Sequence, residues 1–440
     1  MRVLLSTYGS RGDVEPLAGL AVRLREQGAG VRVCAPPDED FARRLADVGV
    51  PLVPVGPSAR ALTRAAPAPA SLPERAARLI AGQLGPVTEA AEGCDLLVAT
   101  GALPAAAGAL SVAEKLGIPS VSVTFQQLTL PAPHRRPLAY PGRPFPPEVT
   151  DPKTLWELDA QSVNTLFGEA LDTHRASLGL PPVDDVRAYV VGDRPWLASD
   201  PFLDPWHETP DLDVVQTGAW ILPDTRPLPA DLTAFLDAGA PPVYVGFGSM
   251  PLHAAADMAR VAVEAVRAQG RRLVLARGWA ELSPGGDRDD CFEVGEVNQQ
   301  ALFARVAAVV HHGGAGTTTT AARAGAAQVV VPQVADQPYW AGRVAALGIG
   351  AAHDGPAPTV ASLSAALGTA LAPETRARAA SAAGRVRADG ASVAARLLLD
   401  AAERGGQDRR SRPAVPPLPA GQDHRSPLTG PPVLAGPPLP

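Results

Sequence analysis

The sequence predicts an α/β protein built from two doubly wound domains. Short apolar runs alternate with segments of helical periodicity from the first residue, which is the pattern of a parallel sheet with helices on both faces. The alternation stops near 206–229, where prolines and turn residues gather, and then restarts. A chain of 440 residues is also too long for one ordinary core. We expect a first domain over 1–205, a linker over 206–229 and a second domain over 230–402.

The first domain begins with a strand over 3–7, a continuous apolar run that ends in small polar residues. A loop follows, and then a helix from about Glu15-Pro16 carries apolar residues at helical spacing until Gly28 ends it. The same alternation predicts strands at 31–35, 52–55, 96–99 and 120–123, and helices at 41–48, 105–116 and 151–178. Residues 128–152 are too rich in proline for regular structure.

The second domain repeats the pattern, after a short strand at 214–217 within the linker. It predicts strands at 243–245, 272–276, 308–311 and 328–331, and helices at 258–269, 317–324 and 340–347. From 403 to 440 the chain is rich in proline, glycine and arginine and contains no aromatic residue. Such a composition cannot bury a core, so we expect a disordered tail there.

Composition argues against several classes of protein. Charged residues make up 19% of the chain and the net charge is −6, so a basic surface for nucleic acid is not expected. Cys34, Cys94 and Cys291 are far apart and form no C-x-x-C pair, which disfavours a disulfide framework or a zinc site. No signal peptide is recognisable, and no uncharged apolar run reaches the roughly 18 residues of a membrane span. We expect a cytoplasmic protein without membrane insertion.

Two acidic triplets with D-x-D spacing, 38–40 and 211–213, are the candidate metal sites. Both lie in polar turns, and neither has a phosphate-binding segment beside it in the sequence. We interpret them as solvated surface and expect no metal site.

The strongest candidate for chemistry is the segment 309–318, in which a buried strand runs into His311-His312, a glycine-rich turn and then a helix. Glycines let the backbone approach an anion, and a helix start presents unpaired N–H groups and a positive dipole end. The segment has neither the lysine of a P-loop nor the G-x-G-x-x-G spacing. It predicts a phosphate or pyrophosphate site. A tight strand–helix turn with incidental histidines is the alternative.

The loop 9–16 lies at the carboxyl end of the first strand, where open α/β sheets bind their ligands. Asp13 in this loop has two interpretations. It is a general base at the top of the sheet, or it caps the helix that follows.

Two further polar turns follow strands of the second domain. Residues 332–338 contain Asp336-Gln337, whose side chains can accept and donate hydrogen bonds to sugar hydroxyls, although a polar turn at a helix start explains them as well. Residues 246–249 end in Ser249, which offers a hydroxyl and an N–H group. Because four such turns occur at strand ends in two domains, we expect a cleft between the domains.

Five segments resemble the glycosyltransferases of vancomycin-type glycopeptide antibiotics: 1–17, 34–38, 218–223, 311–318 and 332–344. The resemblance runs from Met1 to about Ala402. It implies the GT-B fold, in which two Rossmann-like domains face each other across a cleft. The first domain then binds the acceptor, the second binds the nucleotide sugar, and the final helix returns to the first domain.

The resemblance also implies a role for individual residues. Asp13 matches the general base, and Asp336 and Gln337 match the pair that contacts the sugar. The residues matched to the donor phosphates are Ser10, Ser249, His312, Gly313, Gly314, Gly316 and Thr317. Plant members of the wider family carry a glutamate for the ribose where this chain has Thr320, so the ribose contacts do not carry over.

The implied activity is a metal-independent, inverting transfer of a hexose, of the glucose or N-acetylglucosamine type, from a UDP- or TDP-linked donor to a hydroxyl of a glycopeptide aglycone. No cofactor is expected, and the protein is expected to be a monomer or a weak dimer. The apolar residues of the proline-rich loop, Leu128, Leu130, Leu138, Tyr140 and Phe145, are expected to form the acceptor surface, unless the loop packs on its own domain. The alternatives are a nucleotide-sugar epimerase of the same fold, a transferase acting on a macrolide or sterol, and a non-catalytic partner of such an enzyme.

Overall fold

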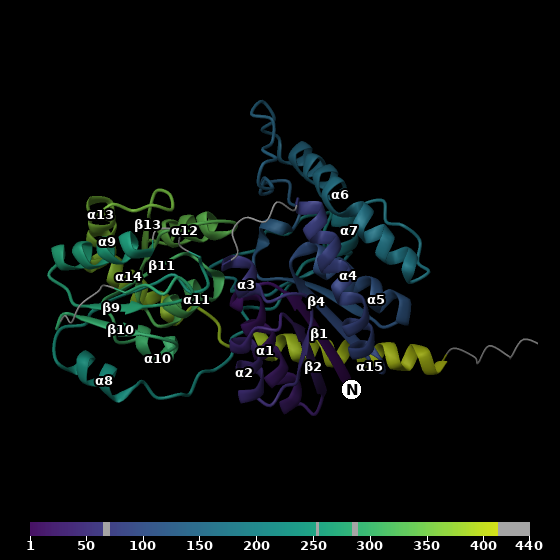
Figure 1. Cartoon of the computed structure of the whole chain (residues 1–440), viewed down its shortest axis with the longest axis horizontal. Helices are drawn as coiled ribbons and strands as arrows, with labels where there is room; N and C mark the ends of the chain where they lie inside the picture. The colour runs from purple at the N-terminus through teal and green to yellow at the C-terminus, as the bar shows by residue number, and fades with distance from the viewer. Residues whose placement is uncertain (65–70, 252–254, 284–288, 412–440) are drawn as a thin grey trace, which may run out of the picture.

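A computed structural model describes residues 1–64, 71–251, 255–283 and 289–411. They form two parallel sheets, each flanked by helices, side by side along the long axis of the molecule (Figure 1). The first sheet has the order β3-β2-β1-β4-β5-β6-β7 and the second the order β10-β9-β8-β11-β12-β13. Every pairing within them is parallel. The predicted α/β class is therefore confirmed.

The strands of the first sheet are β1 (Arg2–Tyr8), β2 (Gly30–Ala35), β3 (Leu52–Pro54), β4 (Leu96–Gly101), β5 (Ser120–Thr124), β6 (Trp196–Leu197) and β7 (Val215–Gln216). Its helices are α1 (Arg11–Glu26), α2 (Glu39–Asp47), α3 (Ala59–Arg64), α4 (Leu72–Ala91), α5 (Leu103–Leu116), α6 (Pro152–Ser177) and α7 (Val186–Val191), with a 3₁₀ turn at Gln127–Thr129. Buried apolar residues of α1 and α2 cover one face of the sheet, and those of α4 to α7 cover the other.

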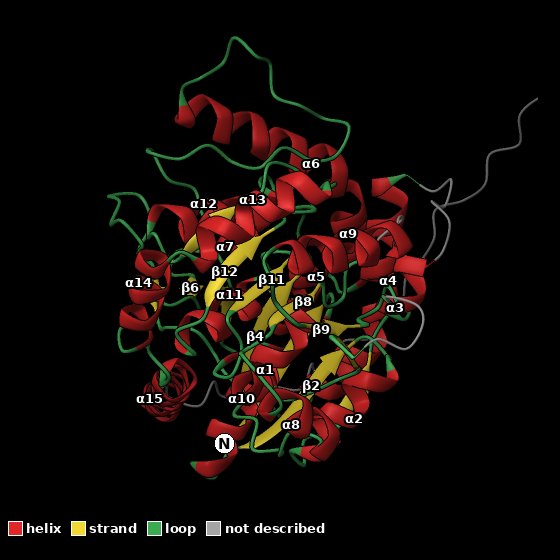
Figure 2. Cartoon of the chain, turned by 90° about the vertical axis from the view of Figure 1, so that its left-hand side faces the viewer, coloured by secondary structure: helices red, strands yellow, loops and turns green. Residues whose placement is uncertain are grey.

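The strands of the second sheet are β8 (Val243–Gly246), β9 (Leu273–Ala276), β10 (Cys291–Val294), β11 (Ala308–His311), β12 (Ala327–Val330) and β13 (Gly350–Ala352). Its helices are α8 (Ala230–Asp237), α9 (Ala255–Ala268), α10 (Gln299–Phe303), α11 (Ala315–Arg323), α12 (Gln337–Ala346), α13 (Val360–Leu371) and α14 (Pro373–Ala383). Figure 2 looks onto this half of the molecule, where α9, α12 and α13 pack on one face and α8, α10 and α11 on the other.

The last helix, α15 (Gly390–Ser411), packs under α1 of the first sheet (Figure 1). Its Ala394 and Leu398 are fully buried in the same cluster as Leu17 of α1. The helix begins where two backbones nearly touch, because a Cβ on Gly390 would lie 2.4 Å from the carbonyl carbon of Gly218. Only glycine permits this crossing, at which the chain that leaves the first domain meets the chain that returns to it.

The linker and the tail differ from expectation. β7 lies inside 206–229, yet it pairs with β6, and Trp220 and Leu222 are buried with α1, so the first unit extends through Leu222. The expected disordered tail begins at 403, but α15 continues to Ser411. Residues 412–440 lie outside the described residues.

Several helices begin earlier than predicted, and three of them do so at the candidate site. α1 begins at Arg11 and contains Pro16, whereas a start near Glu15-Pro16 was expected. α11 begins at Ala315 and α12 at Gln337, in place of Thr317 and Trp340. In these three cases residues that were interpreted as loop form the first turn of the helix. Across the described part of the chain, no helix has the length and apolar character needed to cross a membrane.

Candidate active site

A cleft of about 1050 Å³ runs between the two sheets. It lies at the carboxyl ends of the strands, where the strand order reverses between β1 and β4 and between β8 and β11. Predicted site residues from both domains line it, namely Ser10, Asp13, Ser249, His312, Gly314, Gly316, Thr317, Asp336 and Gln337. Gly313 is the one predicted site residue that does not belong to this lining.

Asp13 sits in the first turn of α1 and takes part in the cap of that helix. Ser10 is the N-cap, and its backbone N–H donates to Asp13 Oδ2 at 2.7 Å, while its Oγ accepts from the Gly12 N–H at 3.3 Å. This is a capping box, so Asp13 is the third residue of the helix and not its N-cap. The structure is compatible with both interpretations of Asp13, because the carboxylate that caps the helix also lines the cleft.

Glycine before the cap makes room for that carboxylate. A Cβ on Gly9 would lie 2.0 Å from Asp13 Oδ2. Burial raises the pKa of Asp13 to about 6 against the lowering effect of the Ser10 N–H, and the negative charge of Asp336 adds to the rise. Asp13 is therefore held in a fixed position with a pKa suited to accepting a proton near neutrality.

A hydrogen bond to the side chain of His311 stabilises the glycine turn after β11. This residue is fully buried, and its Nδ1 accepts from the Gly313 N–H at 3.1 Å while its Nε2 lies 2.9 Å from Gln328 Oε1. Gly313 has φ +93°, and a Cβ there would lie 2.7 Å from Val330 Cγ1. The Gly313 N–H already donates to His311, and Gly313 does not line the cleft, so the expectation that Gly313 binds phosphate is corrected. Gly313 forms the turn, and the residues after it face the cleft.

The start of α11 is the candidate anion site. Gly314 is the N-cap and brings no side-chain cap, and the first turn contains no acidic residue. Ala315, Gly316 and Thr317 line the cleft. The first-turn N–H groups of a helix have no acceptor within the helix, so this end offers donors and a positive dipole to an anion.

His312 lies between two glycines. Its Cε1 would be 3.2 Å from a Cβ on Gly248, and its Nε2 would be 2.6 Å from a Cβ on Gly314. Within the described part of the chain its Nδ1 is buried and has no hydrogen-bond partner. Burial lowers the pKa of His312 to about 4, so the ring is neutral at pH 7. A buried neutral imidazole with an unused nitrogen suits hydrogen bonding to a ligand oxygen.

The two residues matched to the sugar contacts differ in how they are used. Asp336 Oδ2 accepts from the indole N–H of Trp340 at 2.8 Å and makes no side-chain cap, although Asp336 is the N-cap of α12. Gln337 is buried, and its Oε1 accepts from the N–H groups of Gln333 at 2.8 Å and Val334 at 3.1 Å. Gln337 therefore holds the loop, and Asp336 presents a carboxylate to the cleft.

Most of the residues of the proline-rich loop that were expected to form the acceptor surface do not line the cleft. Of those five, only Leu130 lines the cleft. Tyr140 packs edge-on against Phe167 of α6 with ring centroids 5.7 Å apart, and Leu138 is 42% exposed. The apolar lining on the first-domain side comes instead from Leu103, Phe125, Leu130, Val190, Val191 and Ile221.

The turn after β9 is a part of the site that sequence reasoning missed. Arg277 and Trp279 line the cleft, and the Trp279 N–H donates to Gly248 O at 2.9 Å. The Trp279 ring reaches across to Phe41 of α2, with centroids 6.4 Å apart. The turn directly follows the predicted strand at 272–276, and this position at the carboxyl end of a strand could have identified it as part of the site.

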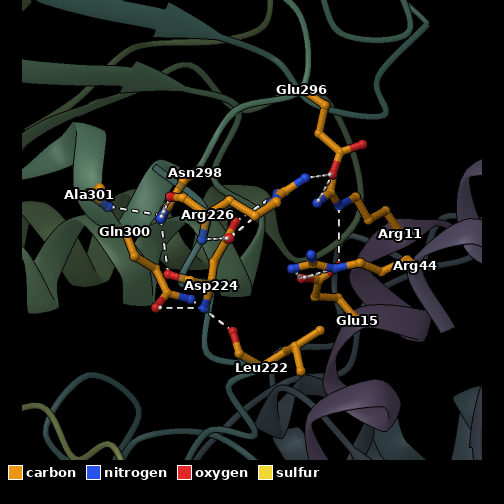
Figure 3. A network of polar contacts seen from close by, with 10 residues as sticks. All are labelled: Arg11, Glu15, Arg44, Leu222, Asp224, Arg226, Glu296, Asn298, Gln300 and Ala301. Atoms are coloured by element: carbon orange, nitrogen blue, oxygen red, sulfur yellow. Dashed lines mark hydrogen bonds and ion pairs between the residues drawn. The ribbon is translucent and has the colours of Figure 1, made fainter. Parts of the chain in front are cut away.

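A polar network ties the start of α1 to the second domain (Figure 3). Arg11 Nη2 lies 3.3 Å from Glu296 Oε1, and Arg226 Nη1 lies 3.2 Å from the same oxygen. Arg11 also pairs with Glu15 at 3.4 Å. Asn298 Nδ2 donates to the carbonyl of Arg226 at 2.7 Å, so the second domain also holds the connecting segment. The network links the helix that carries Asp13 to the second domain.

Comparisons with known proteins agree with this architecture. Residues 3–130 match the model of the glycosyltransferase family 28 N-terminal domain, and residues 289–395 match that of the erythromycin biosynthesis protein CIII-like C-terminal domain. The chain is 58% identical to glycosyltransferase GtfE of Amycolatopsis orientalis over 94% of its own length and 100% of the relative's. It is also 58% identical to the vancomycin aglycone glucosyltransferase of the same organism, over 92% of its length and 98% of the relative's.

Solved structures show the same fold. The glycosyltransferase of kitacinnamycin superposes with a TM-score of 0.67 at 22% identity, covering 91% of this chain and 98% of that one. A match over 91% of this chain extends across both sheets.

Proposed function

The chain belongs to the vancomycin-type glycopeptide glycosyltransferases, and on that premise we propose that it transfers a hexose from a nucleotide sugar to a ring hydroxyl of a glycopeptide aglycone, with inversion at the anomeric carbon. The observation that carries the proposal is that the two domains contribute different chemical groups to the cleft. Asp13 faces it from the first domain, and the open start of α11, His312 and Asp336 face it from the second.

Asp13 is the proposed base. Its carboxylate takes the proton of the acceptor hydroxyl as the oxygen attacks the anomeric carbon, and the bond to the β-phosphate oxygen breaks in the same step. A positioned base contributes about 10²–10⁴-fold. A phenolic acceptor, with a reference pKa of about 10, would ask less of the base than an aliphatic alcohol.

The donor diphosphate is proposed to bind at the start of α11. The N–H groups of Ala315, Gly316 and Thr317 and the ring of the neutral His312 meet the charge that builds on the leaving phosphate. Because these donors are fixed before the reaction, they require no metal ion to neutralise the leaving group. Asp336 accepts hydrogen bonds from hydroxyls of the sugar.

The proposed donors are UDP- or TDP-linked glucose or N-acetylglucosamine, and no other cofactor is required. The name of the vancomycin aglycone glucosyltransferase supports both the acceptor class and glucose. We propose that the protein works in the cytoplasm as a monomer or weak dimer. Cys34 and Cys94 are buried and form no disulfide, which fits a reducing compartment.

The test is a matrix of donors and acceptors followed by mass spectrometry. UDP-glucose, TDP-glucose and UDP-N-acetylglucosamine are each offered with vancomycin aglycone, a macrolide, a sterol and a simple phenol. We expect one hexose added to the aglycone, with a β-linkage by NMR. Turnover of the macrolide or sterol but not the aglycone would remove the glycopeptide assignment, and a new nucleotide sugar formed without acceptor would indicate an epimerase.

A further inference from the structure

A hydrogen-bonded bridge that shares no residue with the Arg11–Glu296 network joins the two domains. Gln127 Nε2 donates to the hydroxyl of Tyr339 at 2.6 Å, and both side chains donate to the carboxylate of Asp204. Gln127 and Asp204 belong to the first domain and are 3% and 0% exposed, while Tyr339 belongs to α12 of the second. The cleft lining includes none of the three, so the bridge is not accounted for by direct contact with a substrate.

One end of the bridge leads to the acceptor side of the cleft. Gln127 begins the 3₁₀ turn, and its neighbours Gln126, Thr129 and Leu130 line the cleft. Arg135 donates to the carbonyl of Gln127 at 2.9 Å and so holds the turn from the other side. A molecule that contacts this turn therefore contacts a segment whose first side chain, Gln127, is hydrogen-bonded to the second domain.

The other end leads to the donor side. The ring of Tyr339 packs edge-on against Trp340, with centroids 5.6 Å apart, and the Trp340 indole N–H donates to Asp336 at 2.8 Å. Arg343, one turn further along α12, donates to the carbonyl of Leu203 at 2.7 Å, next to Asp204. Both contacts fix the orientation of the helix whose first residues face the donor.

We propose that Tyr339 is a positioning residue that couples the two substrates, so that ordering of the acceptor turn at Gln127 strengthens binding of the donor sugar at Asp336. The inference rests on the proposed function. Burial raises the pKa of the Tyr339 hydroxyl and Asp204 adds to the rise, so the hydroxyl keeps its proton and remains a donor to the carboxylate. Coupling of this kind is reciprocal and typically amounts to about 5–150-fold in affinity.

The experiment measures donor affinity with and without the acceptor. Calorimetry is done in the Asp13→Asn background, in which we expect both substrates to bind and transfer to be slow, with UDP-glucose titrated in the absence and presence of saturating vancomycin aglycone. We expect the aglycone to tighten donor binding by at least about 5-fold. Tyr339→Phe should abolish this gain while leaving donor affinity without aglycone within about twofold, because the ring and its contact with Trp340 remain.

Tyr189→Phe is the matched control. Its hydroxyl also makes two side-chain contacts, to Ser111 Oγ at 3.2 Å and Glu114 Oε2 at 3.1 Å, but both lie within the first domain and away from the cleft. A merely structural role for Tyr339 predicts that both variants lose similar stability and keep the coupling.

A second variant, Gln127→Met, removes the same bridge from the opposite side. It should lose the coupling too, and the double variant should lose no more than either single one, because groups that act as a unit are not additive. Coupling retained in Tyr339→Phe, or lost equally in Tyr189→Phe, would overturn the inference. So would a donor affinity that is indifferent to the aglycone when both bridge residues are intact. Turnover of the wild-type protein with the same substrates reports separately on the proposed function.

Discussion

At the scale of single residues, the side chains of the site are positioned by close packing against glycines, where any larger residue would clash. The carboxylate of Asp13 occupies the space where a side chain on residue 9 would lie, and the ring of His312 does the same at Gly314. The Gly313 N–H is used by His311, so the phosphate donors begin one residue later. Sequence alone predicted the residue types of this site. It did not predict how His311 is used, because that depends on a hydrogen bond made inside the folded turn.

Gly9→Ala tests the fit around Asp13. The backbone of Gly9 lies outside the left-handed region, so alanine is tolerated by the chain, and the clash is with the carboxylate alone. We expect transfer to fall by about 10-fold or more, since the base is displaced, with a stability loss of about 1 kcal/mol from the disturbed cap.

Gly168→Ala on α6 is the control for this substitution, because nothing lies within 4 Å of its added methyl group. It should keep the wild-type rate of transfer and lose no stability, since alanine in a helix interior is favoured over glycine by about 0.5–1 kcal/mol. A Gly9→Ala protein with full activity would show that the position of Asp13 is not critical.

The pH dependence of kcat/KM tests the state of Asp13. Burial places the pKa of this carboxyl at about 6, and only its deprotonated form accepts a proton. The rate should therefore rise with pH up to about 6 and level off above it. An acid limb near the ordinary aspartate value of about 4 would contradict the assigned environment of the base.

At the scale of secondary-structure elements, alternation of apolar runs and helical segments predicted both sheets. It missed the early start of α1, because Gly9 to Gly12 reads as a loop and the capping box of Ser10 and Asp13 does not have the usual glutamate. It missed the extent of the first unit as well, because the prolines around the predicted strand at 214–217 placed that strand in the linker, whereas β7 pairs with the first sheet. The pairing of Arg11 with Glu296 joins residues far apart in sequence, and no local pattern carries that information.

Leu398→Ala tests the return of α15 to the first domain. Leu398 is fully buried against α1, so its truncation should lower the free energy of unfolding by about 2–5 kcal/mol. Leu399→Ala, at a half-buried position on the same helix, should cost clearly less. Equal effects in denaturant melts would mean that this face of α15 does not pack as described.

At the scale of the whole molecule, the reaction depends on two domains that each bring half of the site. The Arg11–Glu296 contacts and the Gln127–Tyr339 bridge hold those halves together at two places. In the proposed function, backbone N–H groups and a neutral histidine bind the donor diphosphate. Transfer should therefore persist in EDTA within about twofold of the untreated rate. Complete loss that magnesium or manganese restores would show that a metal ion takes part.

The most direct test of the account is Asp13→Asn, measured for both transfer and donor binding. Asparagine keeps an oxygen for the Ser10 N–H, so the helix cap survives while the base is lost. We predict that transfer falls by about 10²–10⁴-fold, the range that a general base supplies, and that donor affinity stays within about twofold, since the proposed donor groups belong to the other domain. A variant that retains more than about a tenth of the wild-type rate would contradict the assignment and leave Asp13 as a helix cap alone.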